Sequence, residues 1–563
     1  MQQTNDSFDM FALQKFPADG KRIFLTVFAV GFFAYGFSMS NMLLGQDNSI
    51  IWYNNFSSVQ DLLAFSVAGR WLANAGLALF GTVNMPWWTG IWSLLLLSVA
   101  AFVTSRTFKI RAPWLQVVLA GVMTVNPYVV STYNYLPSAP SYMLALLFAC
   151  LAPYFLQRYR WGAVPAFLCM MLTDALYTTY LSVSVCWIIL LVVQRILQNP
   201  GNTSNVFKKE VYSMFLAAAS LAVTLGICQL IVHFAGLNAQ DRVLRATSMG
   251  LRDYVDKIIS TYSLVLYRLF SNWKSSYMQG IPCMLLRIVV VLAFILALLL
   301  FYKAKLWRYP EALLILACNI FVLPLGIDLI GILQTSHSLM GYAYITPLVL
   351  CIVLLSNVLE LQAFPRAFVF GRILPFMVVG CNLLYVLCFA QLANKAASFR
   401  YVQYESATQL ATRIVDRLES QADYIPGVTP VLITGKFPES YYYTDGEWGR
   451  VAAEPFAELK NIEGANAWMA FTYQECFEYM VTQVLGTKLN LLHAESASGG
   501  STSFSTDLKE LIARIQQDNP TVTQEELQES LNTVDAFPAQ NCCVWVEDVL
   551  VLKMDLGQEQ MYL

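Results

Sequence analysis

The chain has few charged residues for its length. Only 13% of its 563 residues are charged, whereas soluble globular proteins carry about 25%. Hydrophobic residues make up 57% of the chain, and the mean hydropathy is +0.52. This composition excludes an ordinary soluble protein and predicts an integral membrane protein. The net charge of −2 indicates little, because membrane proteins sort their cations by side.

Several chemical signatures are also missing. The three histidines lie far apart, and the twelve cysteines form no CxxC pair and no cysteine–histidine cluster, so neither a structural zinc nor a haem site is expected. Most cysteines lie in apolar runs, but Cys476, Cys542 and Cys543 do not, and a disulfide among these three stays open. No Walker loop, GxGxxG after a strand, or HExxH is present, so nucleotide hydrolysis and metalloprotease chemistry have no support.

Long apolar runs predict eleven transmembrane helices, most of them near the ~20-residue spanning length, while the third and fifth runs are shorter. The runs at 161–173 and 177–195 form either one long helix or a pair broken around Thr173-Asp174. No internal repeat is evident, which disfavours a two-halved transporter. The predicted spans are 22–42, 87–105, 112–126, 140–157, 161–173, 177–195, 211–234, 282–302, 310–332, 340–359 and 371–393.

Lysine and arginine gather at alternate ends of these spans. The short loops at the other ends, 127–139, 174–176 and 333–339, contain neither residue. The positive-inside rule therefore places the N-terminus in the cytoplasm, and an odd number of spans places the tail outside. We expect a multi-pass protein of the cell inner or plasma membrane. Its expected parts are a cytoplasmic segment 1–21, a membrane domain 22–393 with outer loops 43–86 and 235–281, and a C-terminal extracytoplasmic domain 394–563.

The outer segments carry their own patterns. An apolar period near 3.6 predicts a membrane-surface helix over 58–79. The tail contains no span and reads as a small α+β domain. Its predicted helices are 406–422, 467–484, 506–517 and 523–532, and its predicted strands are Pro430–Thr434 and 543–554.

The first outer loop holds the strongest candidates for chemistry. Asp47, Asp61 and Arg70 are its only charged side chains, and charge near a membrane is costly to keep. Asp47 either is a solvated helix-end acid or acts as a general base that takes a proton from an attacking hydroxyl. Arg70 either pairs with an acid or binds a phosphate through its planar donors.

Other polar residues also have two interpretations, one structural and one in ligand binding. Asn126 and Tyr128 lie in an uncharged loop that suits sugar binding or forms an ordinary outer turn. Asp174 with Tyr177 marks a polar break that is either functional or a helix cap. The remaining candidates are Trp71, as an aromatic wall beside Arg70, and Arg242 and Arg245, as ligands of a lipid phosphate or plain headgroup contacts.

These motifs, in this order, resemble the bacterial glucosyltransferases that modify O-antigen and other surface polysaccharides. These seroconverting-type enzymes belong to the GT-C class of polytopic glycosyltransferases. The resemblance rests on Gln46-Asp47 after the first span, Gly69-Arg70, Asn126-Pro127-Tyr128 and the break 175–179, with a further likeness in the tail at 466–468 and 549–553. The chain departs from the family pattern in three places. Gln46 replaces one of two adjacent acids, Thr178 follows Tyr177 where glutamine is usual, and an arginine expected near Tyr342 and Tyr344 is absent.

The resemblance implies a GT-C-like fold and a donor sugar on polyprenyl phosphate, most often glucose, presented on the outer face. It implies that Asp47 is the base of an inverting displacement onto a glycan or glycolipid acceptor. Gln46 would lie beside it, and Arg70, helped by Arg242 or Arg245, would meet the leaving phosphate. Some relatives bind a divalent metal, but with one carboxylate in the motif no metal or other cofactor is expected. A polyprenyl-phosphate glucose synthase and a flippase would act upstream, and no nucleic acid partner is expected.

Two other functions stay open. The first is a transporter or flippase for a lipid-linked sugar, for which Arg287 in the eighth span and Asp328 in the ninth are the best candidate charged residues. The second is a non-catalytic assembly protein of an envelope polysaccharide complex, with the tail as its interaction module.

Overall fold

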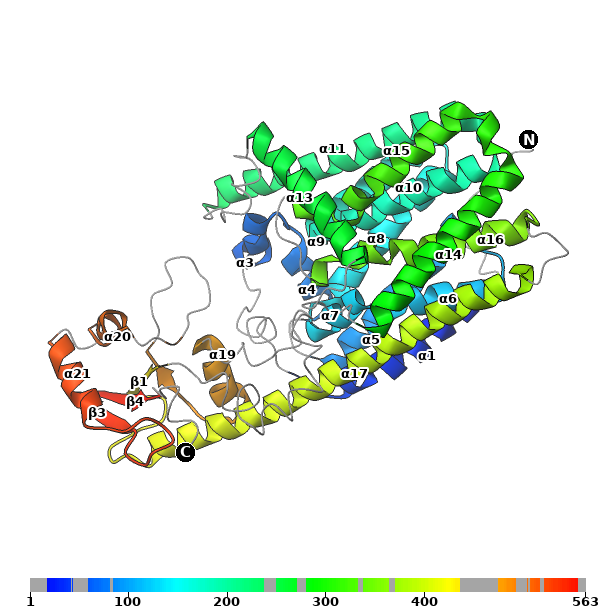
Figure 1. Ribbon diagram of the computed structural model, residues 1–563. Helices are drawn as coiled ribbons and strands as arrows, with labels where there is room; N and C mark the ends of the chain where they lie inside the picture. The colour runs from blue at the N-terminus through cyan, green and yellow to red at the C-terminus, as the bar shows by residue number, and fades with distance from the viewer. Residues whose placement is uncertain are drawn as a thin grey trace, which may run out of the picture.

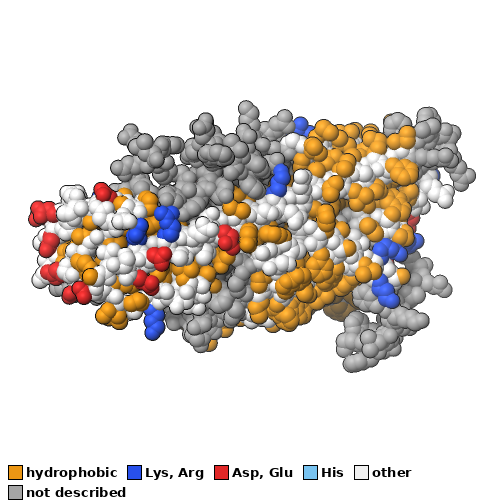
Figure 2. Space-filling model, turned by 90° about the horizontal axis from the view of Figure 1, so that it is seen from below, with side chains coloured by type: hydrophobic (Ala, Val, Ile, Leu, Met, Phe, Trp, Pro, Cys, Tyr) orange, Lys and Arg blue, Asp and Glu red, His pale blue; other side chains and the backbone are white. Residues whose placement is uncertain are grey.

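The protein is a bundle of long apolar helices joined by one extended helix to a small C-terminal sheet (Figure 1). The computed structural model describes residues 18–41, 43, 59–81, 85–236, 250–270, 280–332, 338–363, 370–435, 474–492, 504, 507–516 and 521–554. On the face shown in Figure 2, hydrophobic side chains cover the bundle and acidic side chains gather on the C-terminal region. The chain is therefore a polytopic α-helical membrane protein, as its composition predicted.

The described residues contain nine helices that are long and apolar enough to cross a membrane. The number is ten when the bent pair α6 (Pro113–Thr124) and α7 (Pro127–Asn134) counts as one span. One of the nine is the stretch 163–198, in which α9 (Ala163–Tyr177), η2 (Thr178–Tyr180) and α10 (Leu181–Gln198) follow without a gap.

This stretch turns back on itself at Tyr177, whose backbone is extended. Ala163 at its start and Arg195 near its end line the same cavity. Both halves also bond to α8 (Ala139–Arg158), through Thr173 Oγ1 to the Ala145 carbonyl and Ser184 Oγ to the Ala149 carbonyl. The stretch is thus the broken pair of two spans. The bent pair α6 and α7 adds one span to the nine, and counting α9 and α10 as separate spans adds another. This count equals the eleven spans that the apolar runs predict.

The remaining long helices of the bundle follow the other predicted runs. Two of them, α5 and α15, start at proline, which fits the first position because its missing N–H has no partner there anyway. α1 packs on α5 and α6, and α8 packs against both α5 and α9. These helices are α1 (Ala18–Ser40), α5 (Pro86–Thr107), α11 (Thr203–Ala235), α14 (Ile281–Ala304), α15 (Pro310–Ile327), α16 (Thr346–Glu360) and α17 (Phe370–Glu419), with the turns η3 (Pro200–Asn202), η4 (Leu306–Arg308), η6 (Ser338–Met340) and η7 (Tyr342–Ile345) between them.

The course of α1 distinguishes the two ends of the bundle. At one end α1 begins, and its Arg22 donates a 2.6 Å hydrogen bond to Gln116 Oε1. We call this the Arg22 end. At the opposite end α1 finishes and the first loop returns to the bundle, where the Leu72 N–H donates to the Ala175 carbonyl of α9. We call this the Arg70 end.

The first loop does not form the single helix predicted over 58–79. It contains α3 (Val59–Leu63), η1 (Ala64–Ala68) and α4 (Ala73–Phe80). Gly69 ends η1 with φ +79°, a left-handed conformation that favours glycine. The prediction of one helix is wrong because the apolar period runs on across this reversal of the backbone.

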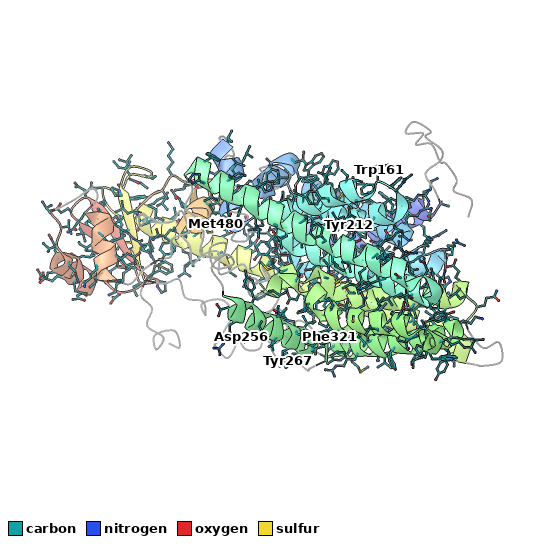
Figure 3. The ribbon with its side chains drawn as sticks, turned by 90° about the horizontal axis from the view of Figure 1, so that it is seen from above. Trp161, Tyr212, Asp256, Tyr267, Phe321 and Met480 are labelled. Carbon is teal, nitrogen blue, oxygen red and sulfur yellow. The ribbon has the colours of Figure 1, made fainter. Side chains whose placement is uncertain are left out.

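The second long loop contains the amphipathic helix α13 (Leu251–Phe270). It packs against α15 and against η5 (Leu329–Ile332). Tyr262 of α13 lies over Phe321 of α15, with ring centroids 5.3 Å apart, and Figure 3 shows Tyr267 and Phe321 on the same side of the bundle. The helix thereby joins the second loop to the bundle beside the end of α15.

The C-terminal region contains a four-stranded sheet in the order β2-β1-β4-β3. β1 (Pro430–Thr434) is parallel to both β2 (Asn490–Leu491) and β4 (Val549–Lys553), with Val431 opposite Leu550. β3 (Cys543–Val546) pairs antiparallel with β4, so the run predicted as one strand is a hairpin. Around the sheet lie α19 (Gln474–Tyr479), the π-helix η10 (Met480–Val484), α20 (Leu508–Ile515) and α21 (Gln524–Asn532).

α17 crosses the expected boundary between residues 393 and 394 without a break. All twelve cysteines lie within the described residues, and all are free. The Sγ atoms of Cys542 and Cys543 are 4.0 Å apart, and the hydrogen bond from the Cys543 thiol lowers the pKa of Cys542 to about 7. The disulfide left open by the sequence is therefore not formed in this structure.

Candidate functional site

Arg70 projects from the break between η1 and α4. Its backbone N–H bonds to the Phe65 carbonyl, 3.1 Å away. Its Cζ atom lies 5.0 Å from the ring centroid of Phe65 and 5.4 Å from that of Tyr177. A planar guanidinium stacks well on aromatic rings and keeps its edge N–H donors available. No acidic side chain of the described residues forms an ion pair with Arg70. No described carboxylate therefore neutralises its charge.

Trp71 places a second donor beside Arg70. Its indole Nε1 is buried and finds no hydrogen-bond acceptor among the described residues. Buried polar groups in native proteins nearly always have a partner. The Arg70 guanidinium and the Trp71 indole N–H are thus two donors, adjacent in sequence and both without a described acceptor, and each suits an anion or a hydroxyl group.

A row of buried tyrosines extends from Arg70 into the bundle. The ring centroids of Tyr142 and Tyr177 are 4.5 Å apart, those of Tyr177 and Tyr180 are 5.6 Å apart, and those of Tyr180 and Tyr342 are 5.7 Å apart. These residues come from α8, α9, η2 and η7. Aromatic faces with hydroxyl tips suit the apolar face and the hydroxyl edge of a sugar. The structure thus brings Arg70 and Tyr177 together, although more than a hundred residues separate them.

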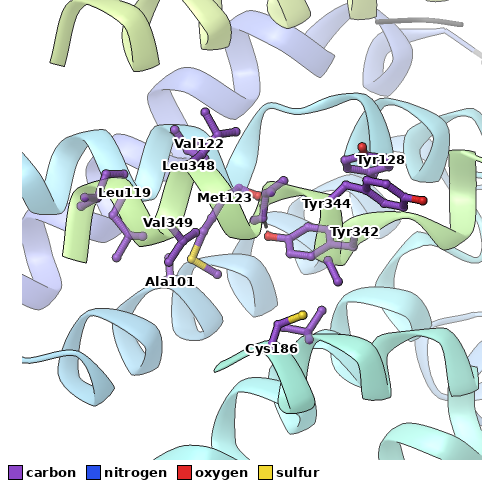
Figure 4. Packing of buried hydrophobic residues seen from close by; sticks show 14 of the residues in the cluster. Ala101, Leu119, Val122, Met123, Tyr128, Cys186, Tyr342, Tyr344, Leu348 and Val349 are labelled. Atoms are coloured by element: carbon purple, nitrogen blue, oxygen red, sulfur yellow. Dashed lines mark hydrogen bonds between the residues drawn. The ribbon is translucent and has the colours of Figure 1, made fainter. Parts of the chain in front are cut away.

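Asn126 and Tyr128 belong to the bend between α6 and α7. Asn126 Oδ1 accepts from the N–H groups of Tyr128 and Val129, both at 3.1 Å, and Nδ2 donates to the Val122 and Met123 carbonyls. These bonds occupy the whole amide, so a ligand would have to replace one of them. The Tyr128 ring lies 5.9 Å from that of Tyr344, and Figure 4 shows both rings close to Tyr342.

Asp174 lies inside α9, one turn before Tyr177. Its side chain is fully buried, and Oδ2 accepts a 3.0 Å hydrogen bond from Ser220 Oγ of α11. Oδ1 has no partner among the described residues. The residue does not stand before the first turn of a helix, so it does not act as an N-cap. It instead links α9 to α11 behind the tyrosine row.

Arg268 forms a second charged cluster beside the row. Its Nη1 donates to Asp328 Oδ2 at 3.2 Å and to Tyr344 Oη at 3.0 Å, and Tyr344 Oη donates to the same carboxylate at 3.0 Å. Its Cζ atom lies 5.5 Å from the Tyr344 ring centroid. Arg268 of α13 therefore places a guanidinium beside Tyr344, where the sequence has no arginine close by along the chain. Sequence reasoning gave Arg268 no role.

The Arg268–Asp328 pair offers a stability prediction. The side chains are only 10% and 2% exposed, so Asp328→Ala would leave a buried guanidinium without its carboxylate. We expect the free energy of unfolding in mixed micelles to fall by about 3 kcal/mol or more. Glu360→Ala is the matched control, because its pair with Arg111 is exposed and should be worth about 1 kcal/mol or less. Equal losses in the two variants would contradict this assignment.

Arg400 is the other residue that sequence reasoning missed. It lies on α17, is 1% exposed, and donates from Nη2 to the Leu43 carbonyl at 3.3 Å. Leu43 precedes Gln46-Asp47 by only a few residues. Arg400 therefore holds the chain where the first loop leaves α1. A lone arginine in the predicted tail gives no such signal, because the contact is between residues 357 positions apart.

Four of the nominated residues lie outside the described part of the chain. These are Gln46 and Asp47 in the first loop and Arg242 and Arg245 in the second. Within the described residues, no group of three or more histidine, cysteine, aspartate or glutamate side chains could hold a metal ion.

Comparison with known families places these features in context. The family model described as glucosyl transferase GtrII matches residues 36–376, a range that covers more than half of the chain and includes Arg70, the tyrosine row and Arg268. Searches of curated proteins and of solved structures gave no match. The chain belongs to the GtrII glucosyltransferase family.

Proposed function

We propose that this membrane glucosyltransferase takes a glucosyl residue from a polyprenyl-phosphate donor. The acceptor is a surface polysaccharide or a glycolipid on the outer face of the cell's inner or plasma membrane. The observation that carries the proposal is Arg70, whose guanidinium carbon lies over the rings of Phe65 and Tyr177 with no described acid partner. It stands at the start of a tyrosine row at one end of an apolar bundle.

The depth of Arg70 favours a lipid-linked donor over a soluble one. Arg70 lies at the end of the membrane helices, which is the level of lipid phosphates. A guanidinium offers bidentate, permanently charged donors to a phosphate, and the Trp71 N–H adds one more. The charge sorting along the sequence supports assigning the Arg70 end to the outside, which cytoplasmic nucleotide sugars do not reach.

Asp47 is the proposed general base. It would take the proton of an acceptor hydroxyl while that oxygen forms a bond to the anomeric carbon of glucose. The bond between this carbon and the phosphate oxygen breaks, and polyprenyl phosphate leaves with the electron pair. Arg400 supports this role because it fixes Leu43, close to Asp47 in sequence.

The remaining candidates take supporting roles in the same proposal. Arg70, with Arg242 or Arg245, would neutralise the leaving phosphate, and Tyr177 with Trp71 would line the glucose. Gln46 would contact the donor or acceptor beside Asp47. No metal or other cofactor is part of the proposed step, and a polyprenyl-phosphate glucose synthase and a flippase would supply the donor.

Donor preference tests the proposal. Membranes would contain the protein and its native surface glycan, and would be freed of endogenous polyprenyl phosphate. They would then receive radiolabelled glucose either as polyprenyl-phosphate glucose or as a nucleotide sugar. We expect label in the glycan only from the lipid-linked donor. Transfer from the nucleotide sugar without a lipid carrier would contradict the proposed donor, although not the glucosyltransferase family.

A further inference from the structure

A cavity of about 860 Å³ lies at the Arg22 end, opposite the proposed active site. It is enclosed by the starts of α1 and α6 and the ends of α5 and α8. Its size is that of a pocket for a small molecule or a lipid headgroup. Its lining contains five cations and one acid, namely Arg22, Arg106, Lys109, Arg111, Arg158 and Asp19.

A second cavity of about 460 Å³ adjoins the first, and the two share Gln157 and Arg158. It lies between the ends of α8 and α10 and the starts of α9 and α11. Its further charged residues are Arg160, Arg195, Lys209 and Glu210. The two linings together carry a large excess of positive charge. We call this pair of neighbouring cavities the basic pocket.

The acids of the basic pocket are already engaged. Asp19 Oδ2 pairs with Arg106 Nη2 at 2.8 Å, and Glu210 Oε2 accepts from Asn319 Nδ2 at 3.2 Å. Lys109 is exposed, adopts φ +55°, and forms no ion pair with an acid of the described residues. Arg111 pairs at 3.6 Å with Glu360, which lines neither cavity. The two linings nevertheless carry eight cations and only two acids.

Exposed aromatic side chains indicate the level of the basic pocket relative to the membrane surface. Tyr159 in the second cavity is 42% exposed, and neighbouring Trp114 and Trp161 are 39% and 80% exposed. Figure 3 shows Trp161 at the edge of the bundle. Exposed tryptophan and tyrosine at helix ends are typical of the headgroup layer. The pocket thus opens where lipid phosphates lie, at the end that the charge sorting assigns to the cytoplasm.

We propose that the basic pocket binds the headgroup of an anionic phospholipid of the inner leaflet. The positive-inside rule explains why lysine and arginine gather at this end of the bundle. It does not explain why they line concave spaces between helix ends, where several cations can contact the same ligand. Basic pockets between membrane helices on the cytoplasmic side are suited to phosphate headgroups. The proposal does not depend on the glucosyl donor or on catalysis.

Native mass spectrometry of the full chain, released from nanodiscs of phosphatidylcholine with a minor fraction of phosphatidylglycerol, tests this proposal. We expect wild type to retain phosphatidylglycerol selectively. In the double variant Lys109→Gln with Arg158→Gln, retention should fall about 10–30-fold, because each cation near the surface contributes about 1 kcal/mol. The variant Lys303→Gln with Arg308→Gln is the matched control, because these cations lie near the same end but line neither cavity.

The other outcomes overturn the proposal. If the control variant lost retention of phosphatidylglycerol to the same extent, the effect would come from general surface charge and not from the basic pocket. Equal retention of phosphatidylcholine would remove the requirement for an anionic headgroup. Displacement of the retained phosphatidylglycerol by millimolar inorganic phosphate would assign the pocket to a soluble phosphate instead of a lipid. Lys109→Arg, which keeps the charge, should bind like wild type and shows that the double variant acts through charge.

Discussion

Asp47→Asn is expected to abolish nearly all glucosyl transfer. A general base contributes about 10²–10⁴-fold to rate, and asparagine keeps the shape of the side chain but cannot accept the proton. Because the base acts in the transition state, we expect kcat to fall while the KM for the donor changes little. Initial rates of transfer from radiolabelled polyprenyl-phosphate glucose, at several donor concentrations, measure both.

The matched control is Asp61→Asn, the other acid of the first loop. The proposal gives it no role in the reaction, so its transfer rate should stay close to that of wild type. Full activity in Asp47→Asn, or equal loss in both variants, would remove Asp47 as the base. The second result would indicate that the loop needs its negative charge only for its structure.

Arg70→Ala is expected to lower kcat by about 10²–10³-fold, the usual cost of removing a donor aimed at developing charge. Arg70→Lys should recover only part of the rate, because an ammonium group lacks the planar face that a guanidinium offers to the rings of Phe65 and Tyr177 and cannot form two parallel hydrogen bonds with a phosphate. The measurement is the same transfer assay, with donor binding followed separately.

Arg413→Ala is a suitable control for Arg70→Ala. Arg413 also lies over an aromatic ring, with Cζ 5.2 Å from the Phe537 centroid, but in the C-terminal region. Its loss should leave the rate of transfer within a few-fold of wild type. If Arg70→Lys were fully active, the stacked, bidentate geometry would be irrelevant and only a positive charge would matter.

The fold was largely predictable because hydrophobicity alone marks membrane helices. Every predicted span has a helix. For the stretch 161–195 the sequence left two alternatives, one long helix or a broken pair, and the extended backbone at Tyr177 shows that it is the broken pair. The helix over 58–79 was not predictable in the same way. Its apolar period continues through Gly69, and only the left-handed backbone at that glycine separates η1 from α4.

The candidate site was predictable in part. Arg70 and Tyr177 were both nominated from sequence, and the structure stacks one on the other. Their contact could not be predicted, because it depends on how α9 turns back beside the first loop. The cluster of Arg268, Asp328 and Tyr344 joins three elements, and a single sequence does not pair residues so far apart. The roles of Gln46, Asp47, Arg242 and Arg245 stay predictions, because these residues lie outside the described chain.

Asp328 was also one of the two charged residues, with Arg287, on which the flippase alternative rested. Its carboxylate accepts hydrogen bonds from Arg268 and Tyr344, which is an arrangement that holds α13 against the bundle. This pairing gives Asp328 a structural role and removes one of the two charges on which the transporter alternative depended. Arg287 of α14 remains for that alternative.

One measurement tests the central claim most directly. Purified protein in sealed proteoliposomes would receive radiolabelled polyprenyl-phosphate glucose in the membrane and the native surface glycan on one side. The transferase proposal predicts that label leaves the lipid fraction and becomes covalently attached to the glycan, and that Asp47→Asn stops this transfer. Movement of the intact labelled lipid across the bilayer, with no label attached to the glycan, would contradict it and favour a flippase.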